Sequence, residues 1–393
     1  MKQQHTLLHR LIAILFLSVL LFACNPAKPG IDLSKIDKER IINAAEKYLL
    51  EVPVTVTAIR AERSFGGLHD FYSEGDYWWQ DPENPEGPYI RKDGQTNPDN
   101  FTAHRLALID LSIWVPALVA AYKITGDEKY AAHAVKHLLA WFVDPSTSMN
   151  PNLMYAQAIM GRVTGRGIGI IDTLHLAEVA RAIQVLEEMR YIEGQNLKGI
   201  KNWFARYLEW MTTHEYGIAE RDNGNNHSTC WVVQVGAFAS LVSKKKDLEF
   251  CRDFYKFTIL PDQMAVDGSF PKELGRTKPY GYSLFNLEAM AMVVQILSTP
   301  EEDLWKFEME DGRSIGRGIG YLYPYLVDKS SWPLDPDVMY HNEWPVRHPF
   351  LLFGGLALDK PEYIKLWKSL DPDPQVGEVI RNFPFRQPVL WID

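Results

Sequence analysis

The chain has 393 residues, of which 46% are hydrophobic, and 41 Lys and Arg stand against 50 Asp and Glu for a formal net charge of −9. An acidic balance of this size argues against nucleic acid as a partner. If the partner is an anion, it requires locally placed arginines, because the field of the whole protein would repel it.

The first 23 residues resemble a bacterial lipoprotein signal peptide. Lys2 and Arg10 precede an apolar run from Leu11 to Phe22, which is too short for a lasting membrane span. The run ends in L-F-A-C, so Cys24 is expected to become the lipidated first residue of a tether over 24–33. A plain signal peptide would also export the chain. We expect a protein of the periplasm or cell surface, held to the outer membrane only by its lipid anchor.

Two further cysteines, Cys230 and Cys251, remain after Cys24. They could pair in an oxidising compartment, but two separate buried thiols are the favoured interpretation. The chain contains neither a C-x-x-C nor an H-E-x-x-H motif. We therefore expect no metal site and no cofactor.

Helical periodicity dominates residues 34–393, and V-P-V-T-V-T at 52–57 is the one segment that favours a strand. Short Gly, Pro or Asp segments separate many of the helical patterns, as in antiparallel helix pairs. The sequence predicts a single all-α domain, an (α/α) barrel or toroid over 34–393. We expect a first helix that begins near Ser34. Further helices are expected to span about 102–123, 127–142, 171–190, 196–213, 228–243, 246–258, 283–298 and 313–326.

Residues 64–101 interrupt this pattern and are expected to form an aromatic lid loop. A structureless stretch of this length in a compact domain is usually functional. Aromatic faces mixed with amides and cations suit the C–H faces and hydroxyls of sugar rings. The alternative is an Ω-loop that packs its own aromatics. The candidate substrate-binding residues in this loop are Trp78, Trp79, Tyr89, Arg91 and Asn97.

The hexapeptides G-R-G-I-G-I at 165–170 and G-R-G-I-G-Y at 316–321 resemble each other. Neither completes a nucleotide-binding G-x-G-x-x-G motif, so glycines that let a helix start close to a neighbour are the better interpretation. Arg166 and Arg317 are nevertheless candidates for holding anions at helix N-termini.

Two polar stretches carry the strongest chemical signal. N-G-N-N-H-S-T-C-W at 223–231 places Asn226 and His227 at a helix start, and Arg276 and Tyr282 precede another helix about 50 residues later. Amide, imidazole, guanidinium and phenol are the groups that β-elimination on a uronate requires. The C5 proton is weakly acidic, so a group must neutralise the neighbouring carboxylate, a base must take the proton and an acid must protonate the departing O4.

Asn226, helped by Arg276, is suited to neutralise the carboxylate. With mannuronate or glucuronate the C5 proton and O4 lie on the same side, so Tyr282 can serve as base and then as acid. With guluronate the proton lies on the opposite side, so His227 would be the base and Tyr282 the acid. A free phenol has a pKa near 10, so Tyr282 needs a nearby cation to act as a base, and Arg276 is the obvious one.

Each of these residues also has a structural explanation. Asn225 or Asn226 can cap the helix, and a lone histidine at a helix start is often structural. Tyr282 can be a core aromatic whose hydroxyl has a hydrogen-bond partner within the protein. Arg276 can bridge to Glu273 on the surface.

Three segments resemble the alginate lyase superfamily: N-N-H-S-T-C-W, E-L-G-R-T-K-P-Y-G-Y-S-L-F-N-L and the Trp-rich G-D-Y-W-W-Q-D-P-E-N-P-E-G-P-Y-I-R-K-D-G-Q-T-N-P-D-N-F. The chain is most similar to polysaccharide lyase family 38 and more distantly to family 5. The resemblance implies an α/α toroid, metal-independent elimination on polyuronates and a cleft partly covered by the N-terminal loop. By position it assigns catalytic roles to Asn226, His227, Arg276 and Tyr282, with Tyr280 as the alternative tyrosine.

We therefore expect a lyase whose partner is an anionic polysaccharide: alginate, mannuronan or glucuronan. The rivals are a glycan-binding lipoprotein without activity and a glycoside hydrolase on the same scaffold. Carboxylates for the hydrolase would come from Glu220, Asp222, Asp267 or Glu273. Weaker substrate-binding candidates, which could equally belong to a packed inter-helix turn or to the core, are Tyr280, His341, Trp344 and Arg347.

Overall fold

The structure of the protein, a computed structural model, describes residues 32–392. The expected signal peptide, the lipidation site at Cys24 and most of the expected tether lie outside the described residues. The lipid anchor and the location at the outer membrane therefore stay predictions.

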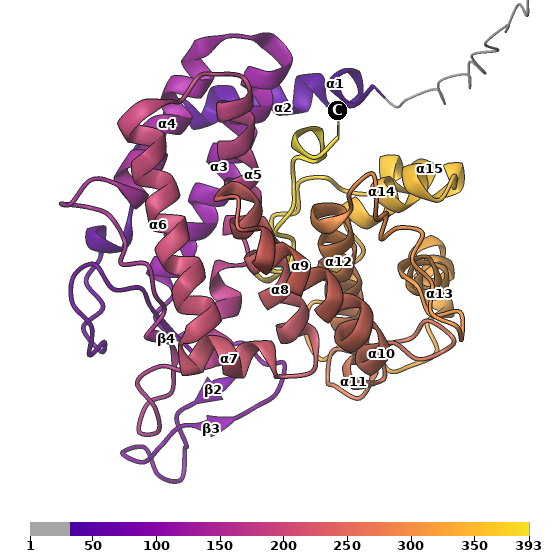
Figure 1. Ribbon diagram of the computed structural model, residues 1–393. Coiled ribbons are helices and arrows are strands. Elements are labelled where there is room, and N and C mark those ends of the chain that lie inside the picture. Colours follow the sequence, from indigo (N-terminus) through magenta and orange to yellow (C-terminus); the bar gives the residue numbers. More distant parts are fainter. Residues whose placement is uncertain (1–31, 393) are drawn as a thin grey trace, which may run out of the picture.

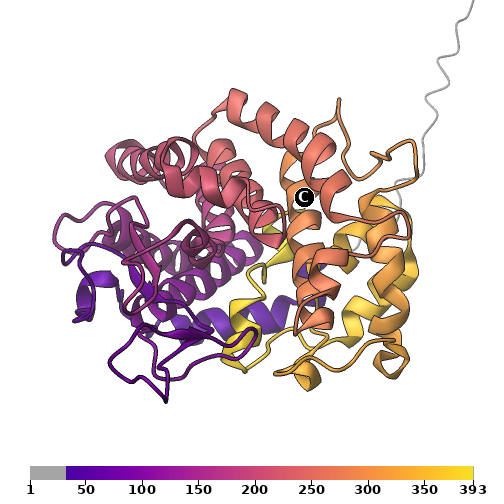
Figure 2. The same ribbon diagram turned by 90° about the horizontal axis from the view of Figure 1, so that it is seen from below.

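Five helices form the inner layer of a ring (Figures 1 and 2), and each packs against the next in chain order. Their side chains are buried on nearly every side, most completely in the third and fourth of them. A helix that is apolar all round needs protein on all sides. The inner helices are α3 (Ala103–Thr125), α5 (Leu176–Glu188), α8 (Asn226–Leu241), α12 (Pro279–Leu297) and α14 (Pro349–Ala357).

A second layer of amphipathic helices covers the inner one, each packed against an inner helix. One hydrophobic cluster runs through both layers, from Ile41 to Leu390. The arrangement confirms the predicted all-α toroid of helix pairs. The outer helices are α2 (Lys38–Tyr48), α4 (Glu128–Phe142), α6 (Gly194–Thr213), α9 (Lys245–Phe254), α13 (Ile315–Val327) and α15 (Pro361–Ser369).

Short elements connect the two layers. The short helices are α1 (Leu33–Ile36), α7 (Glu215–Arg221), α10 (Leu260–Gln263), α11 (Pro271–Leu274) and α16 (Gly377–Arg381). A π-helical turn, η3 (Tyr255–Ile259), joins α9 to α10. The 3₁₀ turns are η1 (Val56–Ala58), η2 (Gly167–Thr173), η4 (Lys329–Ser331), η5 (His341–Glu343) and η6 (Pro388–Leu390).

α3 is the one described helix that is long and apolar enough to cross a membrane, yet 72% of its most apolar stretch is buried within the protein. The apolar composition of α3 is explained by its burial in the inner layer of the ring. The two thiols of Cys230 and Cys251 are also buried and form no disulfide, as expected.

The strand prediction at 52–57 is wrong. Residues 52–55 are irregular and the turn η1 follows, with the Thr55 hydroxyl accepting a hydrogen bond from the Thr57 backbone N–H. The same hydroxyl donates to the Thr147 carbonyl oxygen at 2.7 Å. Strand pairing requires a neighbouring strand, and none of the described strands lies beside this segment.

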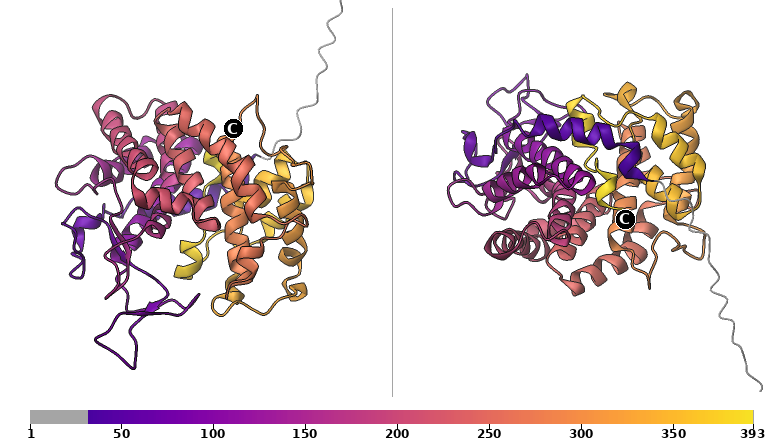
Figure 3. Two further views of the ribbon diagram at one scale, coloured as in Figure 1. Left: turned by 60° about the horizontal axis from the view of Figure 1, so that its bottom comes forward. Right: turned by 90° about the horizontal axis from the view of Figure 1, so that it is seen from above.

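The lid loop over 64–101 contains little helix, as predicted, and is organised by four short strands. β1 (Tyr72–Glu74) pairs in parallel with β4 (Tyr155–Ala158), which ties the base of the lid to the ring. β2 (Trp78–Trp79) and β3 (Ile90–Arg91) form an antiparallel hairpin. The hairpin region projects from the ring (Figure 3, left).

The last residues of the chain run through the middle of the ring (Figure 2, yellow). The buried carboxylate of Glu178 on α5 accepts hydrogen bonds from the backbone N–H groups of Arg386 and Gln387. Burial raises the pKa of Glu178 to about 7. The Arg181 guanidinium donates to the Leu390 carbonyl oxygen at 2.6 Å. These bonds fix the C-terminal segment and with it α16, which reaches the candidate site.

Candidate active site

A cavity of about 290 Å³ lies where the N-terminal ends of α8 and α12 meet the lid hairpin, η2 and the end of α16. All four predicted catalytic residues line it, together with Trp78 and Arg91 of the predicted lid residues. The remaining lining residues are Asp76, Tyr77, Gln157, Arg166, Ile168, Ile171, Asn223, Asn225, Phe285, Arg381 and Asn382.

The two adjacent asparagines at the start of α8 have different roles. The Asn225 side chain is the helix cap, because its Oδ1 accepts from the His227 backbone N–H at 3.0 Å. Asn226 is buried, and its backbone N–H and Nδ2 both donate to the Glu273 carboxylate, at 3.1 and 2.8 Å. An amide held this way cannot turn its oxygen toward Glu273. The orientation of the Asn226 amide is therefore fixed at the cavity wall.

His227 is held from behind by a second buried carboxylate. Nδ1 of His227 lies 2.7 Å from Oε1 of Glu220, a fully buried residue of α7. The other oxygen of Glu220 has no hydrogen-bond partner among the described residues. Burial raises the pKa of Glu220, and the contact with His227 opposes that rise. A carboxylate at Nδ1 favours the tautomer whose Nε2 carries a lone pair. His227 is thereby prepared to accept a proton at Nε2.

Tyr282 lies beside a cation and a second phenol. Its hydroxyl donates to the Tyr77 hydroxyl at 2.8 Å, and the Arg276 guanidinium stands 4.4 Å from the centre of the Tyr282 ring. Burial raises the pKa of Tyr282, and Arg276 opposes this rise without cancelling it. The phenol is therefore neutral in the ligand-free protein and holds a proton to donate.

Arg276 does not bridge to Glu273 on the surface. Its Nε and Nη2 contact the two carboxylate oxygens of Asp93 in the lid loop, at 3.1 and 2.9 Å. Burial alone would raise the pKa of Asp93, but Arg276 holds it at about 2. The pair connects the lid directly to the start of α12.

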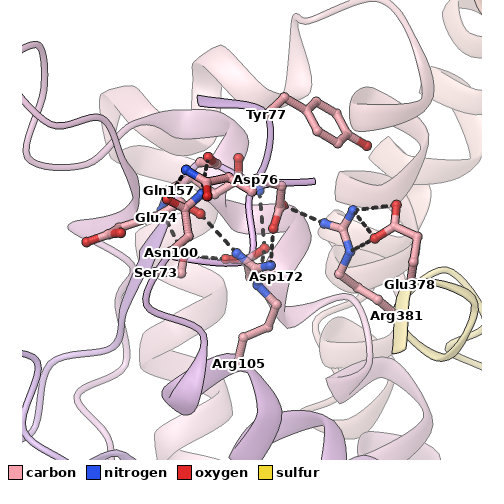
Figure 4. Close-up of polar contacts among 12 residues, drawn as sticks. Ser73, Glu74, Asp76, Tyr77, Asn100, Arg105, Gln157, Asp172, Glu378 and Arg381 are labelled. Atoms are coloured by element: carbon pink, nitrogen blue, oxygen red, sulfur yellow. Dashed lines mark hydrogen bonds and ion pairs between the residues drawn. The ribbon is translucent and has the colours of Figure 1, made fainter. Parts of the chain in front are cut away.

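A buried ion network supports the cavity floor (Figure 4). The Asp76 carboxylate lies between Arg105 and Arg381, at 2.5 and 2.7 Å. Burial alone would raise the pKa of Asp76, but the two cations hold it below its usual value. Arg381 also pairs with Glu378, which pairs with Lys278 at 2.8 Å. Breaking one partner of a buried pair typically costs about 3–5 kcal/mol, so this network fixes the base of the lid.

Five predicted substrate-binding residues do not line the cavity and make structural contacts. Asn97 is buried and bonds to the Trp78 carbonyl oxygen and to Asn100. Tyr280 is a core aromatic whose hydroxyl donates to the Tyr325 carbonyl oxygen. His341, Trp344 and Arg347 lie in the connection that precedes α14. The His341 ring accepts a hydrogen bond from the Asp337 backbone N–H, and the Trp344 ring stacks on His348. The Arg347 guanidinium pairs with Asp37.

Trp79 and Tyr89 are half-buried in the lid and do not line the cavity. Nε1 of Trp79 donates to the Gln95 carbonyl oxygen. The Tyr89 backbone carbonyl accepts from Arg162. A contact of these two residues with a longer substrate stays a prediction.

The structure adds residues that are not among the predicted site residues. Asp76 and Tyr77 of the lid loop line the cavity together with Gln157 and Arg381, which come from two other, distant segments of the chain. Gln157 has a left-handed backbone, with φ of 49°. Such a conformation is uncommon for a residue other than glycine and often marks a functional site, but sequence alone does not reveal it.

None of the four carboxylates named as candidates for hydrolysis lines this cavity. Of the four candidates, Glu220 and Glu273 lie behind His227 and Asn226 and are engaged by them. Asp222 pairs with Arg221, and Asp267 accepts from the Ser269 N–H. Among the described lining residues Asp76 is the only carboxylate, and it is held between two arginines.

The comparisons with known proteins agree with this site. The alginate lyase family model matches residues 55–332. An alginate lyase from Bacteroides ovatus is 32% identical, with a TM-score of 0.78 over 91% of this chain and 93% of that one. A histidine-to-alanine variant of alginate lyase A1-III complexed with a tetrasaccharide is 15% identical, with a TM-score of 0.57 over 91% and 94%. Alginate lyase A1-III from Sphingomonas species A1 is also 15% identical, with a TM-score of 0.53 over 91% of this chain and 94% of that one. A search of curated proteins finds no match.

The toroid and the family match define the protein as a polysaccharide lyase. The matched segment includes the lid, the Asn-His pair and the arginine and tyrosine at the start of α12. The chain belongs to the alginate lyase family. Its placement nearer to family 38 than to family 5 stays a prediction.

Proposed function

We propose that the protein depolymerises alginate or a closely related polyuronate by metal-independent β-elimination in this cavity. The observation that carries the proposal is that four groups line one cavity: the amide and imidazole of α8, the guanidinium of the turn between α11 and α12, and the phenol of the first turn of α12. The names of the similar structures, alginate lyases with and without a tetrasaccharide, support the substrate class.

The charge on the lining residues suits an anionic polymer. Four arginines and one carboxylate line the cavity, although the chain as a whole carries −9. The N-termini of α8 and α12 add the positive ends of two helix dipoles. This local field is what an acidic protein needs to hold a polyuronate.

In the proposed reaction the substrate carboxylate receives hydrogen bonds from Asn226 and charge from Arg276. Removing the C5 proton pushes electron density onto that carboxylate, so fixed donors there lower the barrier. The buried carboxylate of Glu273 uses one N–H of the Asn226 amide and leaves the second for the substrate. A preset donor needs no reorganisation during the reaction.

Tyr282 protonates the departing O4 in either stereochemical course. For guluronate, Nε2 of His227 takes the C5 proton from the opposite side. For mannuronate or glucuronate, Tyr282 must first lose its proton and then act as base. Because burial raises the pKa of Tyr282, that course depends on the Arg276 cation over the ring. The electron pair of the C5–H bond becomes the C4–C5 double bond as O4 leaves.

The proposal is tested with purified protein in the presence of a chelator, on alginate and on homopolymers of each uronic acid. The expected result is an increase in near-ultraviolet absorbance from the new double bond. Hydrolysis without that absorbance, or binding of the polymer without turnover, would favour one of the two rivals. Loss of activity with chelator, restored by a divalent metal, would show that the elimination needs a metal.

Glu220 is expected to position His227 without touching the substrate. Replacing Glu220 by glutamine should lower kcat about tenfold with little change in KM, because the imidazole loses its fixed tautomer. In a Glu220→Gln/His227→Ala double variant the loss should be no larger than in His227→Ala alone, since the first residue acts through the second. Additive losses would contradict this role.

A matched control exists elsewhere in the core. Glu288 is also fully buried beside a histidine, with Oε2 3.5 Å from Nδ1 of His348. Neither residue lines the cavity. Glu288→Gln should change the free energy of unfolding and leave kcat unchanged.

A further inference from the structure

A second hollow, of about 910 Å³, lies on the outer wall of the ring. It is bordered by α13, by the start of α15 and by the segment 305–308 that follows α12. α13 and α15 stand on the side of the ring away from the hairpin β2–β3 (Figures 1 and 3). This outer hollow shares no lining residue with the catalytic cavity. Its lining includes Trp305, Phe307, Arg317, Gly320, Tyr321 and Tyr363.

Gly320 keeps one wall of the outer hollow open. It lies inside α13, where glycine destabilises a helix relative to alanine. Gly318 on the same helix has a packing reason, since a Cβ there would lie 2.8 Å from Cε of Met264. Beyond its own helix, no described residue would lie within 4 Å of a Cβ at Gly320. Packing within the protein therefore does not account for Gly320, whereas a ligand in the hollow would.

Arg317 gives the outer hollow a cation that no carboxylate binds. Its Nε donates to the Val266 carbonyl oxygen at 3.2 Å, and it makes no ion pair with another described residue. Two carboxylates line the hollow, but Asp267 accepts from the Ser269 N–H and Glu308 is exposed. The exposed Arg317 guanidinium keeps its other N–H donors for a ligand. The two lysines of the hollow are already paired, Lys306 with Asp303 and Lys360 with Glu362.

Aromatic rings complete the outer hollow. Phe307 and Tyr321 are half-buried, and the more deeply buried Trp305 and Tyr363 lie behind them in the lining. Apolar ring faces suit the C–H faces of sugars, and the guanidinium fork of Arg317 suits a carboxylate. A uronate carries both of these groups. The open volume also exceeds that of the catalytic cavity, so several linked units have room.

We infer that the outer hollow is a second, non-catalytic binding site for the polyuronate. The inference rests on the proposed function for the identity of the ligand. A polymer held on the outer wall has a raised effective concentration at the catalytic cavity of the same molecule. Only a chain long enough to reach both places gains from this. The outer hollow should therefore matter for a polymer and not for a short oligosaccharide.

Gly320→Gln is the sharpest test, because it fills the outer hollow with a side chain that has room there and favours the helix. It should raise KM on a long uronate homopolymer about 3- to 30-fold without changing kcat. On a uronate tetrasaccharide kcat/KM should stay within about twofold of the wild-type value, because the catalytic cavity is untouched. Arg317→Gln should act in the same direction, since it removes the carboxylate-binding fork. Initial rates from near-ultraviolet absorbance measure both substrates.

Lys365→Gln is the matched control for the charge. Lys365 is an exposed residue of α15 that does not line the outer hollow. Its replacement removes one positive charge close to the hollow, as Arg317→Gln does within it. KM on the homopolymer should stay unchanged in this variant.

Binding is measured separately by native electrophoresis through gels that contain the uronate homopolymer, with Tyr282→Phe as the background to suppress cleavage. Adding Gly320→Gln should reduce the retardation of the protein, and adding Lys365→Gln should not. Gels that contain dextran, a neutral polymer, should retard none of these proteins.

The inference is overturned if Gly320→Gln keeps either the wild-type KM on the homopolymer or the full retardation, or if it impairs polymer and tetrasaccharide equally. A wild-type dimer that Gly320→Gln dissociates in sedimentation would also overturn it, because the hollow would then be an interface between two copies. If the wild-type protein forms no unsaturated product from either substrate, the proposed function fails. Retardation in the gels then decides whether the outer hollow binds the polymer.

Discussion

Replacing Tyr282 by phenylalanine is expected to lower kcat on polyuronates about 10³- to 10⁴-fold. The substitution removes only the hydroxyl, which in the proposed reaction protonates O4 in every stereochemical course, and proton transfer by a placed side chain contributes about 10²–10⁴-fold. The ring should stay packed under Arg276, 4.4 Å from its centre. Initial rates from near-ultraviolet absorbance give kcat, and calorimetry on an oligosaccharide should show nearly unchanged binding.

Tyr280→Phe is the control for this prediction. The same hydroxyl is removed two residues earlier, from a buried side chain that donates to the Tyr325 carbonyl oxygen outside the cavity. It should cost about 1 kcal/mol of unfolding free energy and leave kcat within about twofold, as expected of a group outside the site. Equal losses of kcat in both variants, or full activity of Tyr282→Phe, would contradict the assignment of the catalytic tyrosine.

Replacing His227 by alanine is expected to have the second largest effect, and its size should depend on the substrate. On guluronate blocks His227 is the proposed base, so kcat should fall about 10²- to 10⁴-fold. On mannuronate or glucuronate blocks Tyr282 takes the proton, so the loss should be smaller by at least about tenfold. Rates on separated homopolymer blocks measure this ratio.

His214→Ala controls for the loss of an imidazole near the same helices. His214 caps α7, and its Nδ1 accepts from the Tyr216 backbone N–H at 3.1 Å. Its loss should cost about 1 kcal/mol of stability without a substrate-dependent change in rate. An equal loss of kcat on all blocks in His227→Ala would refute the division of the base role between His227 and Tyr282.

The sequence predicts the toroid because the outer helices are amphipathic and their apolar residues recur at three and four positions. It is weaker for α7, α14 and α15 and for the short helices α10, α11 and α16, which do not appear among the expected helices. α7 spans two turns, and α14 is apolar on all sides, so neither shows periodicity. The strand pattern at 52–57 also misleads, because a pairing partner is a property of the fold and not of the segment.

The candidate catalytic residues could be predicted because each lies in a local motif at a helix start. Both Asn225 and Asn226 line the cavity, and the structure shows that Asn225 caps α8 while the Asn226 amide is held by Glu273, a distinction that the sequence leaves open. Arg381 could not be predicted, because the C-terminal segment brings it to the cavity through bonds to α3 and α5. Trp344 and Arg347 are residue types that suit a sugar, but the Trp344 side chain is buried, Arg347 pairs with Asp37, and neither lines the cavity.

The structure of the newly formed non-reducing end tests the central claim most directly, and proton NMR with mass spectrometry of the products measures it. Elimination predicts a vinyl proton at C4 of the terminal unit and fragment masses that add up to the parent oligosaccharide. Saturated ends, with one water added for each bond cleaved, would contradict the account.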